Sequence, residues 1–133
     1  MSKSRLIITG VFVVLAMLVL SACGPKKAEL TVDMTDYKFT PDTFEVPAGV
    51  EVTLHISDSG TLPHEFVVMK LGTQATPPFD DNDEGNIFWE VELEKGEAQT
   101  VTFTAPTDKG TYQVVCGTPG HLEQNMVGTL TVK

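Results

Sequence analysis

Hydrophobic and polar residues alternate along several short stretches of the chain. Over residues 50–57, valine, leucine and isoleucine alternate with glutamate, threonine, histidine and serine. Residues 87–94 and 101–103 show the same period of two, which is typical of strands with one buried face. Shorter apolar runs predict further strands at residues 30–34, 43–46, 65–70, 111–116 and 128–132.

Proline, glycine and aspartate residues separate these runs, as at Pro47-Ala48-Gly49 and Asp58-Ser59-Gly60, and such residues favour turns. No stretch after residue 28 keeps an apolar period of 3.6 residues for three helical turns. Seven or eight short strands in one domain, residues 29–133, predict an all-β Greek-key β-sandwich.

The first residues have the three-part pattern of an export signal. Lys3 and Arg5 precede the apolar run 6–20, and the small residues Ser21 and Ala22 follow it. The run has 15 residues, fewer than the roughly 20 of a membrane-spanning helix. We therefore expect a signal helix that is removed, with an uncleaved membrane anchor as the alternative.

The segment Leu20-Ser21-Ala22-Cys23 resembles the lipobox of bacterial lipoproteins. That resemblance implies that residues 1–22 are a lipoprotein signal peptide and that the Cys23 thiol becomes lipidated. Residues 23–28 would then form a short tether. Both the cleaved form and the anchored form leave the domain exported and membrane-anchored on the extracytoplasmic side, in the periplasm or at the cell surface.

Composition narrows the possible functions. The chain has 133 residues and a formal charge of −9, which argues against nucleic acid as a partner and allows one domain, expected to be a monomer. Two cysteines and three histidines are too few for a disulfide scaffold, a multi-zinc protein or a multicopper enzyme. Residues 80–97 include eight acidic residues, which suits either a docking patch for a basic partner or a solvated surface.

Four residues have side chains suited to one metal ion. Cys116 is followed by His121 and then by Met126, each five residues further on, and His64 begins an earlier strand. A thiolate, two imidazoles and a weak axial thioether form the ligand set of a blue-copper electron-transfer site. Each residue also has a simpler interpretation, because buried cysteine and methionine commonly fill cores and histidines often bind nothing.

Residues 29–133 resemble the cupredoxin family of blue copper proteins, of the plastocyanin, azurin and auracyanin type. The resemblance lies in the segments 44–49, Leu62-Pro63-His64 and 110–112, and in the order Cys116-x4-His121-x4-Met126. It implies one mononuclear type 1 copper ion, with His64, Cys116 and His121 as strong ligands and Met126 as the axial ligand. It also implies an apolar rim around His121, formed by Leu62, Pro63, Pro119 and Leu122.

Other residues near these ligands have different expected roles. Many members of the family carry asparagine after the first ligand histidine, whereas this chain has Glu65. Strand alternation predicts that Glu65 points away from the face that His64 uses, although a metal-bound Glu65 is an alternative. His55 is expected on an outward face, and Met34 and Met69 in the core.

Four protein ligands leave no open position for water or substrate, so we expect no enzyme activity. The sequence instead predicts a membrane-tethered carrier of single electrons between redox proteins outside the cytoplasm. The alternative is a copper-binding module for storage, delivery or sensing of copper. Retention of the metal during redox cycling would favour the carrier, and transfer of the metal to an acceptor would favour the alternative.

Overall fold

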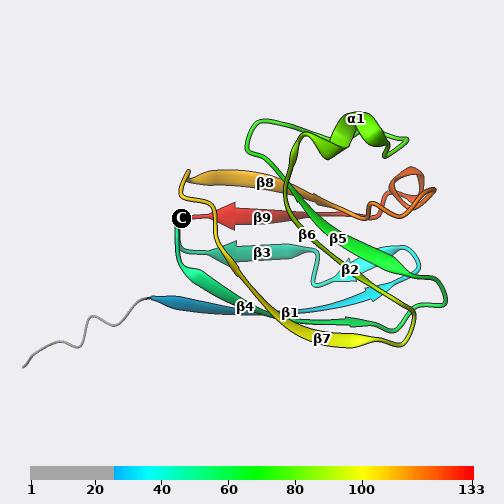
Figure 1. The fold of residues 1–133 in the computed structure, drawn as a ribbon, viewed down its shortest axis with the longest axis horizontal. Helices are drawn as coiled ribbons and strands as arrows, with labels where there is room; N and C mark the ends of the chain where they lie inside the picture. The colour runs from blue at the N-terminus through cyan, green and yellow to red at the C-terminus, as the bar shows by residue number, and fades with distance from the viewer. Residues whose placement is uncertain (1–25) are drawn as a thin grey trace, which may run out of the picture.

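The computed structural model describes residues 26–133, so the predicted signal peptide and Cys23 lie outside the described residues. Within this range the chain forms two β-sheets that pack face to face, as predicted for a sandwich (Figure 1). The first sheet has the order β2-β1-β4-β7. Its strands are β1 (Lys27–Thr35), β2 (Lys38–Thr40), β4 (Glu51–Asp58) and β7 (Ala98–Thr104).

The second sheet has five strands in the order β3-β9-β8-β5-β6. Its strands are β3 (Thr43–Val46), β5 (His64–Met69), β6 (Ile87–Leu93), β8 (Gly110–Val115) and β9 (Val127–Val132). Two pairs are parallel, β1 with β4 and β3 with β9, and the other pairs are antiparallel. Three pairs join strands that are consecutive in sequence, β1/β2, β5/β6 and β8/β9, and the other four join strands that are further apart in the chain. This mixture of hairpins and longer connections is the pattern of a Greek key.

Three details differ from the sequence prediction. Strand β2 was not predicted, because three residues with a single buried side chain, Phe39, carry no readable alternation. Strand β1 begins at Lys27, two residues inside the segment predicted as tether. A single-turn helix, α1 (Asp81–Glu84), lies in the acidic segment and begins with a capping box at Asp80.

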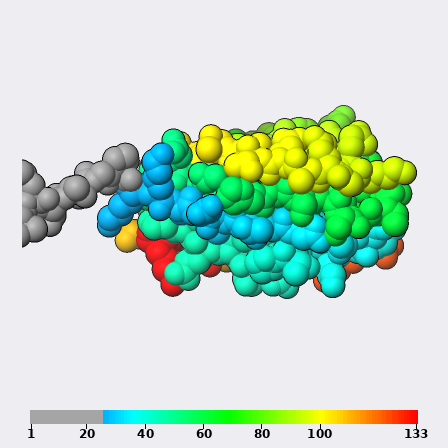
Figure 2. Space-filling model, turned by 90° about the horizontal axis from the view of Figure 1, so that it is seen from below, coloured from blue at the N-terminus to red at the C-terminus, as the bar shows by residue number. Residues whose placement is uncertain are grey.

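Alternation along the strands builds the core. Every second residue of β4 from Val52 to Asp58 is buried, and His55 lies between them on the outer face, as predicted. His55 Nε2 lies 2.7 Å from the Glu29 carboxylate. Figure 2 shows the outer surface of this sheet, with β7 in yellow, β4 in green and β1 in blue. Met34 and Met69 are fully buried, which confirms their placement in the core.

Aromatic residues join the two sheets. Trp89 of β6 stacks on Phe103 of β7 with the ring centroids 4.4 Å apart, and Phe66 of β5 has the rings of Phe39 and Phe44 against it edge-on. Such pairs add roughly 0.5–1.5 kcal/mol each beyond the burial of their area. The sandwich therefore gives the connecting loops a rigid base.

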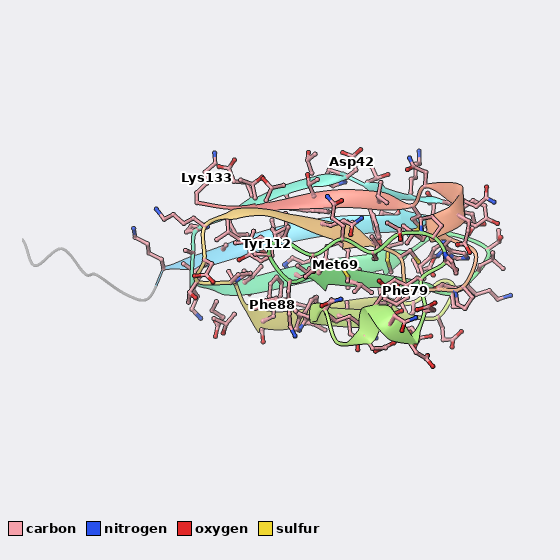
Figure 3. The ribbon with its side chains drawn as sticks, turned by 90° about the horizontal axis from the view of Figure 1, so that it is seen from above. Asp42, Met69, Phe79, Phe88, Tyr112 and Lys133 are labelled. Carbon is pink, nitrogen blue, oxygen red and sulfur yellow. The ribbon has the colours of Figure 1, made fainter. Side chains whose placement is uncertain are left out.

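The two ends of the sandwich carry different parts of the chain. The loop between β8 and β9 lies at one end, whereas β1 begins and the chain ends at the opposite one (Figure 1). The side chains of Phe88, Tyr112 and Lys133 lie toward the end where β1 begins (Figure 3). Among residues 26–133, no helix has the length and apolar character needed to cross a membrane.

Candidate metal centre

The loop between β8 and β9 is closed by three backbone hydrogen bonds. The Cys116 N–H donates to the Met126 carbonyl (3.2 Å), the Met126 N–H to the His121 carbonyl (3.1 Å), and the His121 N–H to the Thr118 carbonyl (3.1 Å). The backbones of the three predicted ligands in this loop are thus linked to one another. Residues 116–126, in which the predicted ligands stand five residues apart, therefore form a compact loop at one end of the sandwich.

Two residues with left-handed backbone conformations make this closure possible. Gly120 has a φ of +87°, which glycine adopts without strain, and it places His121 at the start of a short 3-10 helix, Leu122–Gln124. Asn125 ends that helix with a φ of 60°, and asparagine tolerates this conformation better than most residues. The chain then returns to β9 through the buried Met126.

Cys116 and His121 are brought within contact distance. The Cys116 Sγ lies 3.3 Å from the His121 Nδ1, and the exposed fractions of these residues are 0% and 4%. Burial raises the pKa of the Cys116 thiol, and burial, followed by the nearby His64, lowers the pKa of His121. Both groups therefore favour their neutral forms, a protonated thiol and an uncharged imidazole. A metal that bound the sulfur would displace the thiol proton.

The sulfur of Cys116 also accepts a hydrogen bond from the backbone. The Glu65 N–H donates to Sγ over 3.4 Å, so β5 and the loop meet at this atom. Backbone N–H groups that point at sulfur stabilise negative charge on it, because they favour the ionised form. This contact is suited to a cysteine that works as a thiolate ligand.

The Glu65 side chain lies on the other side of β5 from His64, against Gly117 and Glu90. A Cβ atom on Gly117 would come within 2.1 Å of Glu65 Oε2, so glycine leaves the space that the carboxyl group fills. Burial, followed by the charge of Glu90, raises the pKa of Glu65 to about 7. The predicted direction of Glu65 is thus confirmed by its contacts with the outer face.

His64 is fully buried and its ring lies beside that of His121, with centroids 4.8 Å apart. Its Nδ1 is 3.0 Å from Asp58 Oδ2, and its Nε2 is 3.3 Å from Asp36 Oδ1. The second contact has ion-pair distance but not hydrogen-bond geometry, so Nε2 is a buried nitrogen without a hydrogen-bond partner. A short distance without the right direction leaves the nitrogen lone pair or N–H unsatisfied.

The four predicted ligands therefore lie at one end of the sandwich, but they do not all contact one another through their donor atoms. Cys116 and His121 touch through their donor atoms, and Met126 is buried and joined to both through the backbone. His64 lies against His121, while its nitrogens are near carboxylates. Over residues 26–133, no three histidine, cysteine or acidic side chains form a ready-made cluster around one point.

Sequence reasoning missed three residues of this site. Asp36 follows the end of β1, Asp58 is the last residue of β4, and both flank His64. Tyr37 packs edge-on against His121 with ring centroids 5.0 Å apart. None of them belongs to a local motif, because they reach the site through the pairing of distant strands. The buried position of Asp58 at the end of an alternating strand was the one available signal.

The predicted apolar rim is partly wrong. Leu62 is 39% exposed, as a rim residue should be, but Leu122 is buried in a second cluster with Val67 and Val115. The short helix turns the Leu122 side chain under the loop and away from the surface. Tyr37, which is 38% exposed and beside His121, lies at the surface instead.

Comparison with known proteins agrees with this architecture. A family model described as "Cupredoxin-like domain" matches residues 8–132. Auracyanin-B of Chloroflexus aurantiacus is 28% identical over 110 residues, which cover 71% of this chain and 46% of that protein. The chain therefore spans about half the length of this relative.

Two solved structures extend the likeness to the whole fold. Reduced auracyanin from the photosynthetic bacterium Roseiflexus castenholzii superposes with a TM-score of 0.65 at 27% identity, covering 79% of this chain and 96% of that one. Auracyanin A from Chloroflexus aurantiacus, described as a "blue" copper protein, gives 0.65 at 26% identity, covering 81% of this chain and 100% of that one. Together with the family model, which spans nearly the full sequence, these matches show that the chain belongs to the cupredoxin family.

Proposed function

We propose that the domain holds one copper ion through His64, Cys116, His121 and Met126 and carries single electrons between redox proteins. The observation that carries this proposal is the buried contact of 3.3 Å between Cys116 Sγ and His121 Nδ1, inside a loop that also places Met126. The described relatives include a "blue" copper protein, which supports the same choice of metal.

The residues fit a copper ion chemically. A soft thiolate and thioether together with two imidazoles suit both copper(I) and copper(II), and bound copper would supply a one-electron couple. The Nε2 atom of His64 is buried and has no hydrogen-bond partner among residues 26–133. Buried polar atoms are usually paired, so this nitrogen is suited to binding a metal ion. The hydrogen bond from the Glu65 N–H would hold the sulfur of Cys116 in its thiolate form.

Burial of the four side chains favours a carrier over an enzyme. His64, Cys116 and Met126 are fully buried and His121 nearly so, so these residues exclude water and leave no position for a substrate. Electrons would pass through the edge of His121, where the partly exposed ring of Tyr37 packs against the imidazole. Rigid packing around the ligands keeps rearrangement small between the two oxidation states.

The arrangement of the chain supports tethering at the membrane. We propose that residues 1–22 direct export, that acylated Cys23 anchors the domain outside the cytoplasm, and that the domain works as a monomer. Strand β1 begins at Lys27, at the end of the sandwich opposite the β8–β9 loop (Figure 1). An anchor just before β1 would leave the candidate site turned away from the lipid and open to redox partners.

A test follows from the difference between carrying electrons and delivering metal. The copper-loaded protein is mixed rapidly with a small inorganic oxidant and then a reductant, and bound copper is measured after repeated cycles. We expect fast exchange with the copper retained. Slow exchange together with ready loss of copper to a chelator would contradict the carrier and favour metal delivery.

A further inference from the structure

We propose that Asp58 and Asp36 are positioning residues for His64, fixing its ring and placing negative charge next to it. This inference rests on the proposed copper site and names residues on which its electrochemistry depends. Neither carboxylate belongs to the ligand set, and each one faces a different nitrogen of the same imidazole.

Asp58 is held firmly in its position. It is the last residue of β4 and its side chain is fully buried, with Oδ2 at 3.0 Å from His64 Nδ1. Its other oxygen accepts the Gly60 N–H over 2.8 Å. The Asp58 backbone bonds to both Glu97 and Gly96, so the strand end cannot shift independently.

A buried carboxylate in this place is costly unless it is paired. Burial of an ionised group without partners costs several kcal/mol. Two hydrogen bonds to the Asp58 carboxylate offset this cost, one from the Gly60 N–H and one from the His64 imidazole. Because a carboxylate only accepts hydrogen bonds, the hydrogen between them belongs to Nδ1 of His64. The pair therefore sets the tautomer of the ring.

Asp36 approaches the ring from the turn after β1. Its Oδ1 lies 3.3 Å from His64 Nε2, and its carboxylate accepts hydrogen bonds from the Thr61 hydroxyl (2.5 Å) and the Thr61 N–H. The Thr61 hydroxyl is the main reason why the pKa of Asp36 lies below its usual value. The turn of residues 58–61 thus holds both carboxylates and leads directly into His64.

Gly60 shows how closely this turn packs on the ring. A Cβ atom at this position would lie 2.7 Å from both His64 Cε1 and Asp36 Oδ1, and 3.0 Å from Asp58 Oδ1. The backbone itself therefore forms the wall between the two carboxylates. The imidazole therefore packs directly against the backbone of this turn.

A metal ion would bind at Nε2, because Nδ1 carries the hydrogen that bonds to Asp58. Asp58 then lies behind the ring, 3.0 Å from Nδ1, whereas Asp36 lies 3.3 Å from Nε2 itself. Histidines that bind metals usually donate their second ring N–H to such a partner, which fixes the ring and makes it a stronger donor. Negative charge next to His64 would also stabilise the more positive, oxidised ion.

The first test uses the metal-free protein. In nitrogen-15 NMR of the histidine rings, we expect a downfield, slowly exchanging N–H proton for His64 in the native protein. Asp58→Asn should move this resonance upfield, whereas Asp42→Asn, at an exposed aspartate outside the site (Figure 3), should leave it unchanged. A His64 resonance that is the same in the Asp58→Asn and native proteins would overturn the proposal.

The second test uses the copper-loaded full-length protein and measures its reduction potential. Asp58→Asn should lower the preference for copper(II) over copper(I) about tenfold, a rise of about 59 mV for a one-electron couple. Asp36→Asn, at a less buried position that tolerates substitution better, should raise the potential by a smaller amount. Potentials that match that of Asp42→Asn in both variants would contradict the proposal.

The two tests separate this inference from the proposed function. A native protein that binds no copper would refute the copper site, and the NMR comparison would then decide the pairing of Asp58 with His64. If the native protein binds copper normally but Asp58→Asn leaves the His64 resonance unchanged, the pairing of Asp58 with His64 is refuted and the copper site is not.

Discussion

The Cys116 thiol and the His121 imidazole are buried side by side, and burial alone favours the neutral form of each. In the proposed copper site the metal would reverse this preference at the thiol, because it would bind the thiolate and displace the proton. The hydrogen bond from the Glu65 N–H would stabilise the charge on the sulfur. We therefore expect the Cys116 side chain to be a neutral thiol without metal and a thiolate with it.

Met126 is expected to tune the site and not to hold the fold. Met126→Leu keeps a similar volume in the core, so it should cost less than about 1.5 kcal/mol of unfolding free energy. Loss of the weak thioether donor disfavours copper(II), so the variant should keep copper and show a higher reduction potential in voltammetry. An unchanged potential would mean that Met126 is not the axial ligand.

Glu65 is expected to make the stability of the metal-free protein depend on pH. Burial and Glu90 raise the pKa of Glu65 to about 7 in the folded state, above its ordinary value. The folded state therefore binds more protons than the unfolded state between these values, and the contribution of this residue to stability falls as pH rises through that window. Glu65→Gln, which cannot ionise, should remove this decline.

Denaturant unfolding of the metal-free protein between about pH 5 and pH 8 measures the effect. The unfolding free energy of Glu65→Gln relative to the native protein should increase with pH. A difference that stays constant across this range would show that Glu65 ionises in the folded state as readily as in the unfolded state.

The candidate ligands could be predicted from sequence to the extent that they are local. Cys116, His121 and Met126 lie in one loop, and their spacing reflects the turns that close it. Asp36 and Asp58 could not be predicted, because their approach to His64 depends on the register of β1 beside β4 and on the packing of a turn. The alternation of β4 indicates that Asp58 faces inward, but nothing in the sequence indicates which side chain it meets there.

At the scale of elements, the turn between β4 and β5 does as much for the site as the β8–β9 loop. Residues 58–61 bind both carboxylates, and the following Pro63 leads into His64 at the start of β5. The strands were predictable from alternation, whereas this turn looked like ordinary connecting chain. The short strand β2 and the inward direction of Leu122 were missed for a similar reason, since each depends on tertiary packing.

Gly60→Ala tests this turn. The added methyl would press on His64 and on two carboxylates, and such overpacking typically costs about 1–3 kcal/mol of unfolding free energy. Copper affinity should fall as well, because the ring of His64 would be displaced. Gly85→Ala is the matched control, since a Cβ there meets no atom within 4 Å. Equal stability and copper affinity of the two variants would argue against a tightly packed turn.

At the scale of the whole molecule, the start of β1 and the candidate site lie at opposite ends of the sandwich (Figure 1). The acidic segment, with α1 and β6, runs along one side of the sandwich and is mostly exposed. If the proposed anchor precedes β1, this arrangement would leave the candidate site accessible to redox partners.

The proposed tether predicts a defined mature N-terminus. Mass spectrometry of the protein purified from membranes of a bacterial host should show Cys23 as the first residue, carrying acyl chains. Cys23→Ser should abolish acylation and release the domain from the membrane fraction. An intact Met1 on the native protein would instead support an uncleaved anchor.

The visible absorption spectrum of the copper(II)-loaded protein tests the central claim most directly. A thiolate bound to copper(II) gives an intense charge-transfer band, so we expect a strongly coloured native protein and a Cys116→Ser variant without that colour. A colourless native protein with copper bound, or colour that survives Cys116→Ser, would contradict a copper site built on Cys116.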